Sequence, residues 1–387
     1  MENIFDFENE SVIKILDTII NDGIKKNAGD IHIEPFEKFI RIRYRIDGCM
    51  HTIYKLNPKI LEPLISRLKI ICKMDISEKR LPQDGNFQFN EQISFRVSTI
   101  PTINGEKAVI RLIYVDNDDL NKNNLGFFEE DLPQIEKLFK NPCGLIVITG
   151  PTGSGKTTTL NSFIKTLNTD EVNIVTVEDP VENIICGINQ VNINPKINFD
   201  FPQSLRAILR QDPDIIMIGE IRDSITASIA MRSAITGHLV LTTLHTNNAI
   251  GSIARLKDMG VEDFMISAAL KGVISQRLVR RLCPNCKQSV KISEADAKIL
   301  NLPTDTVVYE SHGCELCNNI GYKGRLALYE YFLIDEKMCK LIENKNTDFK
   351  SYLHEKNFST LKDNAIKNVL LGNTSINEIY KKIILEE

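Results

Sequence analysis

A glycine-rich run from Gly150 to Thr157 carries the clearest chemical pattern, because it reads G-P-T-G-S-G-K-T and matches G-x-x-x-x-G-K-[ST]. Glycines in such a loop let backbone N–H groups approach a phosphate, and the following helix offers its N-terminus to the same anion. The flanks fit, since residues 145–149 predict a strand and residues 158–167 a helix. We expect Lys156 to reach the β and γ phosphates of ATP and the Thr157 hydroxyl to ligate Mg²⁺. The predicted binding residues are Gly150, Thr152, Gly153, Ser154, Gly155, Lys156, Thr157 and Thr158.

Hydrolysis also needs acidic groups near the γ-phosphate, and two positions supply them. An apolar strand predicted at 174–177 runs into Glu178, and another at 215–218 runs into Gly219 and Glu220. In open α/β sheets, ligands bind at the carboxyl ends of strands. Acids that only cap a strand are the alternative. We predict Glu178 and Glu220 as catalytic, with Glu220 joining Thr157 at Mg²⁺.

A third apolar strand, predicted at 239–241, leads into the polar run T-T-L-H-T-N at 242–247. A lone histidine is most often a packed or a surface residue. At a strand end in this arrangement, His245 is better explained as a sensor of the γ-phosphate. We therefore add His245 to the catalytic residues.

The cysteines indicate a metal site rather than a disulfide framework. Their total of nine is odd, and four of them are scattered along the chain, at Cys49, Cys72, Cys143 and Cys186. Another four form two C-x₂-C pairs, and 27 residues separate the pairs. Two redox dithiols are the alternative, but four thiolates in two knuckles suit tetrahedral Zn²⁺ with a structural role. The predicted zinc ligands are Cys283, Cys286, Cys314 and Cys317.

Composition limits what the elements around these residues can be. The chain has 387 residues, enough for two or three domains. Its 47 Lys and Arg against 51 Asp and Glu give a net charge of −4, which argues against general binding to nucleic acid. The sequence shows no basic start followed by an apolar run, and no apolar run of about 18 residues. We therefore expect a soluble cytoplasmic protein.

The hydrophobic pattern divides the chain into four parts. Helices predicted at 11–27 and 61–74, with strands at 40–46, 87–89, 94–99 and 108–114, form a small N-terminal α/β domain over residues 1–115. A polar stretch at 116–124 reads as a linker. Alternating strands and helices over 125–280 predict a parallel sheet with helices on its faces. Residues 281–387 are expected to be cysteine-bearing and loop-like, then helical to the end.

In this order, the motifs resemble those of the secretion ATPases that drive type IV pilus assembly and type II secretion. The resemblance is nearly end to end. Beyond the phosphate loop it includes an Asp box at Thr176–Glu182, a Walker B stretch at Leu209–Asp223, a His box at Thr236–Asn247 and the run Gln276–Cys283. It implies an α/β fold with a RecA-like P-loop ATPase core, a small PAS-like N-terminal domain, a zinc-bearing helical C-terminal region and assembly as a homo-hexamer.

The resemblance also implies roles for individual residues. Glu220 would organise Mg²⁺ and its water, while Glu178 would be the base that positions the attacking water. The family uses arginines of the N-terminal domain as contacts in trans to the γ-phosphate. The arginines that match are Arg41, Arg43, Arg45, Arg96 and Arg111, of which Arg41, Arg96 and Arg111 are our catalytic candidates. A solvated or salt-bridged sheet face is the alternative for each of them.

The function that follows is an ATP-hydrolysing motor for assembly of a type IV pilus or a type II secretion pseudopilus. Such a motor would work through a polytopic inner-membrane platform protein, which would hold it as a peripheral protein at the inner face of the cell membrane. The tetracysteine element favours assembly over retraction, because retraction ATPases generally lack it. A retraction motor, a competence-pilus ATPase, a DNA-transfer ATPase and a regulatory nucleotide sensor are the alternatives.

Overall fold

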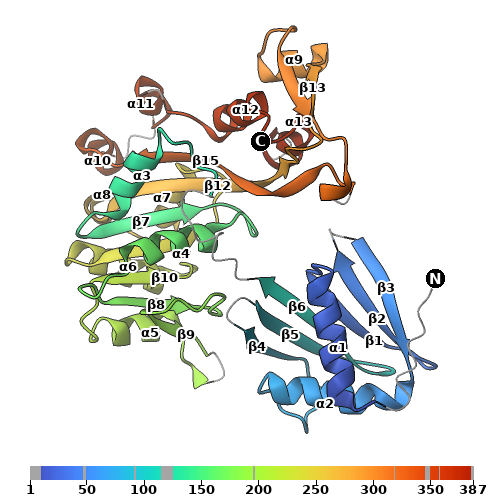
Figure 1. The fold of residues 1–387 in the computed structure, drawn as a ribbon. Coiled ribbons are helices and arrows are strands. Elements are labelled where there is room, and N and C mark those ends of the chain that lie inside the picture. Colours follow the sequence, from blue (N-terminus) through green and yellow to red (C-terminus); the bar gives the residue numbers. More distant parts are fainter. Residues whose placement is uncertain are drawn as a thin grey trace. The chain divides into compact units, whose positions relative to one another are not determined.

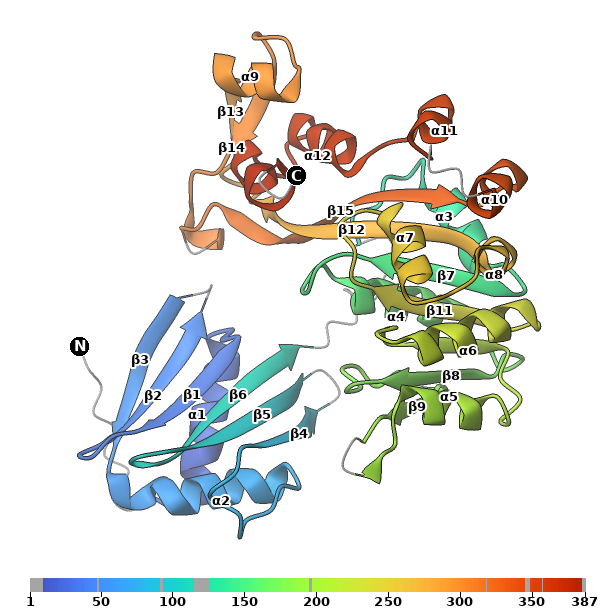
Figure 2. The same cartoon turned by 180° about the vertical axis from the view of Figure 1, so that it is seen from behind.

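The chain divides into two compact units, residues 1–117 and residues 118–387. The computed structural model describes residues 10–46, 49–90, 93–114, 125–194, 197–317, 319–344, 349–356 and 358–384. Figures 1 and 2 show the elements of both units from opposite sides. The linker expected at 116–124 lies outside the described residues.

Unit 1 is a six-stranded antiparallel sheet with two helices packed on one face (Figure 1). The strand order is β3-β2-β1-β6-β5-β4. Both expected helices form, and two strands that the sequence pattern did not predict, β1 and β3, join the sheet. The elements are α1 (Val12–Lys25), β1 (Asp30–Pro35), β2 (Ile40–Ile46), β3 (Cys49–Leu56), α2 (Leu61–Ile71), β4 (Gln83–Asn90), β5 (Ile93–Thr102) and β6 (Gly105–Tyr114).

Alternation along β2 explains how this sheet buries one face. Ile40, Ile42 and Tyr44 are buried, while the arginines between them point to the other face. Helix α1 begins at the cap residue Ser11, whose side chain accepts a hydrogen bond from the backbone N–H of Lys14. The apolar stripe of α1 packs on the buried face of the sheet in one core with α2.

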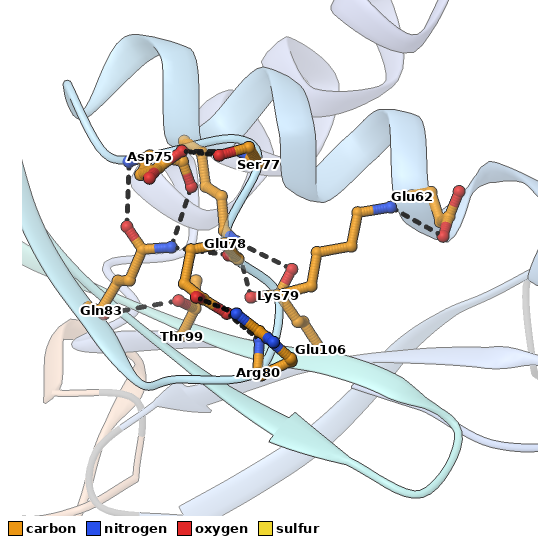
Figure 3. A network of polar contacts seen from close by, with 10 residues as sticks. Glu62, Asp75, Ser77, Glu78, Lys79, Arg80, Gln83, Thr99 and Glu106 are labelled. Atoms are coloured by element: carbon orange, nitrogen blue, oxygen red, sulfur yellow. Dashed lines mark hydrogen bonds and ion pairs between the residues drawn. The ribbon is translucent and has the colours of Figure 1, made fainter.

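A network of polar contacts holds the segment between α2 and β4, and Figure 3 shows residues of this network, among them Asp75, Glu78, Gln83 and Glu106. The side chain of Lys69 is 1% exposed, and its Nζ lies 2.7 Å from Oε1 of Glu106. Nζ also donates to the carbonyl oxygen of Glu78 at 2.7 Å. The amide of Gln83 accepts from the N–H of Asp75 and donates to its carbonyl oxygen, both at 2.9 Å. This segment is therefore fixed to the helix and the sheet by interior polar contacts.

Unit 2 contains a seven-stranded sheet in the order β15-β12-β7-β11-β10-β8-β9. The pairings are parallel, except that β15 runs antiparallel to β12. Its elements up to β12 are α3 (Leu132–Phe139), β7 (Gly144–Thr149), α4 (Lys156–Leu167), β8 (Ile174–Glu178), β9 (Asn189–Asn192), α5 (Phe201–Ile208), β10 (Ile215–Ile218), α6 (Ser224–Ile235), β11 (Leu239–Leu244), α7 (Gly251–Asp258), α8 (Asp263–Ala269) and β12 (Leu270–Leu282).

The elements after β12 are β13 (Gln288–Lys291), α9 (Glu294–Leu300), β14 (Val307–Glu310), a 3₁₀ turn (Glu315–Cys317), β15 (Tyr322–Leu333), α10 (Glu336–Glu343), α11 (Phe349–Glu355), α12 (Leu361–Leu370) and α13 (Ile376–Ile379), with a π-helical turn (Tyr380–Ile384) after α13. Strands β13 and β14 form a small separate sheet. The expectation that this region is helical to its end is wrong for β15, because that strand pairs along β12 and completes the main sheet.

Helices cover both faces of the large sheet, as Figure 1 shows. Successive residues of β7 alternate between two cores: Leu145 and Val147 pack with α5, α6, α7, α8 and α10, whereas Ile146 and Ile148 pack with α3 and α4. Burial on both faces explains why the parallel strands read as continuous apolar runs. The expected division after residue 280 falls inside β12, so the strand that leads to the first cysteine pair belongs to the main sheet.

A further small core lies where the β12–β15 pair extends beyond the parallel strands. It gathers Val279 and Leu328 from the two strands with apolar residues of β14, α9, α12 and α13. No helix in the described part of the chain has both the length and the apolar character that crossing a bilayer requires.

Candidate functional site

A pocket of about 370 Å³ lies at the carboxyl ends of β7, β8, β10 and β11 in unit 2. Seven of the eight predicted phosphate-binding residues line it, and so do the predicted catalytic residues Glu178, Glu220 and His245. Gly150 begins the same loop. The parallel sheet brings these residues together because its strands end at one edge. The pocket is lined by Thr152, Gly153, Ser154, Gly155, Lys156, Thr157, Thr158, Glu178, Asp179, Pro180, Glu182, Phe201, Met217, Gly219, Glu220, Thr243, His245, Leu278 and Arg325.

The phosphate loop joins β7 directly to α4. Gly155 has a φ of 84° and caps the N-terminus of α4, where the left-handed backbone favours glycine. Lys156 is 9% exposed, and its Nζ donates to the carbonyl oxygens of Gly150 and Pro151 at 2.9 and 3.0 Å. Burial lowers the pKa of Lys156 to about 8, Glu220 opposes that shift, and Arg277 adds to it. The ammonium group therefore lies over the loop that would hold a phosphate.

Glu178 is the last residue of β8 and is 3% exposed. Its Oε1 accepts hydrogen bonds from Thr176 Oγ1 at 2.6 Å and from Gln190 Nε2 at 3.1 Å. Burial raises the pKa of Glu178, which outweighs the two hydrogen bonds, and the charge of Glu182 acts in the same direction as burial. A carboxylate with a raised pKa accepts a proton more readily, which is a property that a general base needs.

Glu220 follows β10 after one glycine, and its carboxylate contacts two cationic or ionisable groups. Arg222 Nη2 pairs with its Oε1, and His245 Nε2 lies 3.4 Å from its Oε2. Burial lowers the pKa of His245, and Lys156 acts in the same direction, while Glu220 opposes both. Thr243 Oγ1 donates to the carbonyl oxygen of Gly219 at 2.6 Å, which fastens the ends of β10 and β11 to each other. Glu220 thus lies beside His245 and close enough to Lys156 to affect the pKa of that lysine.

The predicted arginines lie in unit 1, where the open sheet face pairs them with two acids. Arg41 Nε and Arg43 Nη2 lie 3.0 and 2.7 Å from the carboxylate of Glu34, and Arg111 Nε lies 2.9 Å from Asp30 Oδ1. Burial raises the pKa of Glu34, but the hydrogen bonds from Arg43 and Arg41 outweigh it and bring the pKa down to about 2.

Two arginines of this face lie next to each other across a strand pairing. Arg96 on β5 is the partner of Arg111 on β6 in the antiparallel register. Like charges opposite each other in a sheet cost stability. The face therefore combines salt bridges, which are the alternative named above, with a local excess of positive charge.

The four cysteines of the two C-x₂-C pairs come together in unit 2, and their Sγ atoms all lie within 4.8 Å of one another. Three of the sulfur pairs are 3.7–3.9 Å apart. A tetrahedral zinc thiolate site with Zn–S bonds of about 2.3 Å has sulfur separations of roughly 3.8 Å. The backbone N–H groups of Gly313 and Gly321 donate to Sγ of Cys286 and Cys317. This donor set fits a four-coordinate metal ion.

Some residues at the pocket were not predicted as site residues from the sequence. Leu278 and Arg325 line it from β12 and β15, which follow the phosphate loop by more than a hundred residues. Gln276 contacts the phosphate loop; the run Gln276–Cys283 was one of the motifs of the resemblance, but Gln276 was given no role from the sequence. Gln190, which contacts Glu178, comes from β9 at the edge of the sheet.

Comparison with known proteins places these features in context. Residues 6–381 match the family described as "Type II/IV secretion system protein". The type IV pilus assembly ATPase PilB of Myxococcus xanthus is 43% identical over 383 residues, which cover 96% of this chain and 68% of that relative. The type II secretion system ATPase E of Vibrio cholerae is 41% identical over 387 residues, which cover 98% and 77%.

Among solved structures, the pilus retraction motor PilT with bound ADP is similar to this chain with a TM-score of 0.71 and 26% identity. The alignment covers 95% of this chain and 96% of that one. The two-unit chain therefore has the α/β fold of these ATPases, and its mixed, largely parallel sheet is consistent with a RecA-like core.

Proposed function

This chain belongs to the family of type II/IV secretion system proteins, as its motifs indicated, and on that premise we propose that it is a Mg²⁺-dependent ATPase that powers assembly of a type IV pilus or a type II secretion pseudopilus. The relatives are named as secretion and pilus ATPases. The observation that carries the proposal is the pocket in which the phosphate loop, Glu178, Glu220 and His245 meet.

The phosphate loop and four residues around it, Thr157, Glu178, Glu220 and His245, have separate roles in this proposal. The backbone N–H groups of the phosphate loop and Lys156 bind the phosphates of ATP. Glu178 orients the attacking water and accepts its proton on Oε2, because both of its hydrogen bonds engage Oε1. Glu220 and Thr157 hold Mg²⁺, which supplies electrostatic stabilisation of the phosphate oxygens when bound. His245 reports the presence of the γ-phosphate through its contact with Glu220.

Replacing Glu220 with Gln tests the enzymatic part of the proposal. Glu220→Gln keeps the shape of the side chain but removes the charge that Mg²⁺ needs, so we expect ATP turnover to fall at least about a hundredfold. Binding of ATP, followed by fluorescence of a labelled nucleotide, is expected to remain. Glu171→Gln, an exposed acid outside the pocket, is the control for loss of one negative charge. Normal turnover in Glu220→Gln contradicts the assignment.

The four-cysteine cluster holds a structural Zn²⁺ in this proposal. Its four thiolates leave no open coordination position, so the ion supplies folding stability rather than catalysis. The donor set and the sulfur spacing support this choice.

We further propose a homo-hexameric ring in which Arg41, Arg96 and Arg111 reach the γ-phosphate of the neighbouring subunit. Arg96 lies opposite Arg111 across two strands although Asp30 already pairs with Arg111, and this excess of positive charge supports a role beyond sheet stability. A platform protein in the inner membrane would hold the ring at its cytoplasmic face. The described part of this chain has no helix that could span the membrane by itself. We propose no direct contact with nucleic acid.

A pilus retraction motor is the second candidate function, supported by the TM-score with PilT. The higher identity to assembly and secretion ATPases and the cysteine cluster favour assembly, and competence-pilus assembly is a variant of it. Deletion of the gene separates the two directions: we expect loss of filaments, whereas an excess of filaments would support retraction.

A further inference from the structure

A single buried amide joins the phosphate loop to β12, the strand that pairs with β7 beside the loop. Gln276 lies on β12 and is 0% exposed. Its Nε2 donates to the carbonyl oxygen of Ser154 at 2.7 Å, and its Oε1 accepts from Thr159 Oγ1 at 3.1 Å. A carbonyl oxygen only accepts, so the amide nitrogen must face Ser154 and the amide oxygen must face the hydroxyl. Gln276 therefore contacts both the loop and the helix that follows it.

Two glycines of the loop leave room for this residue. A Cβ at Gly150 would lie 2.4 Å from the backbone oxygen of Gln276, and a Cβ at Gly155 would lie 3.2 Å from its Nε2. The absence of a side chain at these glycines thus allows β12 to approach the loop closely. Gln276 itself is not among the residues that line that pocket.

The hydrogen bond to Ser154 fixes the direction of one peptide group. In a trans peptide the C=O and the following N–H point to opposite sides. The Ser154 carbonyl points to Gln276, which does not line the pocket, so we infer that the N–H of Gly155 points toward the pocket. Phosphate loops bind anions with such N–H groups, and their affinity depends on those groups being aimed before the ligand arrives.

We infer that Gln276 is a positioning residue for nucleotide binding, which holds the Ser154–Gly155 peptide so that the Gly155 N–H is aimed at a phosphate of ATP or ADP. The inference rests on the proposed nucleotide site. In this inference, Gln276 contributes to nucleotide affinity through one hydrogen bond, from its Nε2 to the Ser154 carbonyl, and not through its packing in the core. The second bond of the same amide, from Thr159, offers a matched comparison.

Three variants of the full chain separate these effects. Gln276→Glu replaces the donor with an acceptor that repels the Ser154 carbonyl and keeps the acceptor for Thr159. Gln276→Met keeps the volume and removes both bonds. Thr159→Val removes only the bond on the helix side. Each variant is titrated with a fluorescent ADP analogue, and its thermal unfolding and its steady-state ATPase kinetics are measured.

We expect Kd for ADP to rise about tenfold in Gln276→Glu and Gln276→Met, and by less than about twofold in Thr159→Val. KM for ATP is expected to rise together with Kd for ADP, while kcat changes little, because the Gly155 N–H binds the substrate and the transition state equally. If Gln276→Glu does not fold, Gln276→Met provides the result. Equal Kd values in Gln276→Met and Thr159→Val at similar unfolding temperatures would overturn the inference. Wild-type protein that does not bind ADP would instead contradict the proposed function.

Discussion

Burial shifts the ionisation of the residues that line the nucleotide pocket. Lys156 and Glu178 are both buried at the carboxyl edge of the sheet, so water stabilises neither charge fully. The pKa of Lys156 falls, that of Glu178 rises, and that of His245 falls. All three shifts favour the uncharged form, and a bound triphosphate with Mg²⁺ would supply the charges that favour ionised Lys156.

The pKa of Lys156 leads to a prediction about pH. A bound phosphate favours the ammonium form, whereas in the free protein burial has lowered the pKa to about 8. Below that pH Lys156 is already charged and binding takes up no proton. Above it, binding must take up a proton, so affinity for ADP is expected to fall by up to about tenfold per pH unit. Calorimetric titrations between pH 7 and 9.5, in buffers with different ionisation enthalpies, measure both Kd and proton uptake.

Lys156→Arg is the control for this measurement. Its guanidinium stays charged across the range, so its Kd, even if weaker, is expected not to change with pH. A wild-type Kd that is constant from pH 7 to 9.5 would contradict the prediction.

The pocket shows which residues a sequence reveals and which it does not. The phosphate loop and the polar residues after β8, β10 and β11 are contiguous with apolar strands, so local pattern predicted them and the sheet brings them to one pocket. Gln276 and Arg325 come from β12 and β15, and their approach depends on a strand order that has no local signal. Salt bridges from Arg41 and Arg111 to Glu34 and Asp30 depended in the same way on β1, which was not predicted.

At the scale of elements, the pairing of β12 with β15 builds the cysteine cluster. Cys283 follows the last residue of β12, and β15 begins at Tyr322, five residues after Cys317. The register pairs Leu282 with Tyr322, so the ends of the two strands lie side by side. The cysteine spacing in the sequence predicted the metal site but not β15. Antiparallel pairing between segments about forty residues apart leaves no periodic signal in a sequence.

Loss of the cysteine cluster is expected to remove zinc and to loosen this end of unit 2. We expect about one zinc per chain in purified protein, little or none in Cys314→Ser, and greater protease sensitivity of the variant after residue 280. Elemental analysis by mass spectrometry and limited proteolysis provide the two measurements. Cys186→Ser, an exposed cysteine outside the cluster, is expected to keep its zinc. Wild-type protein without zinc would contradict the metal assignment.

At the scale of the molecule, the two units carry complementary groups. Unit 2 holds the phosphate loop and the two glutamates, whereas unit 1 holds the arginines Arg41, Arg96 and Arg111. An arginine that reaches a γ-phosphate in trans is worth roughly 10³–10⁵ in rate in related chemistry. Hydrolysis would then require two chains, and neither would be sufficient by itself.

Mixing two inactive variants tests this arrangement. Arg96→Ala keeps a complete phosphate pocket and lacks one arginine, whereas Glu220→Gln keeps the arginine and lacks the carboxylate proposed to hold Mg²⁺. Each alone is expected to hydrolyse ATP slowly. If the arginine acts in trans, about a quarter of the sites in an equal mixture contain both groups, so turnover should recover to about a quarter of the wild-type value. The same mixture is made for Arg41→Ala and Arg111→Ala.

The double variant Arg96→Ala/Glu220→Gln, mixed with Lys156→Ala, is the control for nonspecific recovery, because no combination of its sites contains all three groups. If the mixture of the two single variants stays inactive, the arginine does not act at the phosphate pocket of a neighbouring chain, and the proposal of action in trans is wrong.

Strand β12 is 13 residues long, but only its first part, up to Ser275, pairs with β7. The remainder, from Gln276 to Leu282, extends about 23 Å at roughly 3.3 Å per residue and ends at the first cysteine pair (Figure 1). If this extension moves as a rigid body, it pivots near Gln276, whose side-chain amide contacts the phosphate loop. A tilt of about 5° at the phosphate loop swings the cysteine end by roughly 2 Å. A shift of β12 beside the phosphate loop that is too small to break a hydrogen bond would thus move the cysteine end of the strand by about the width of an atom.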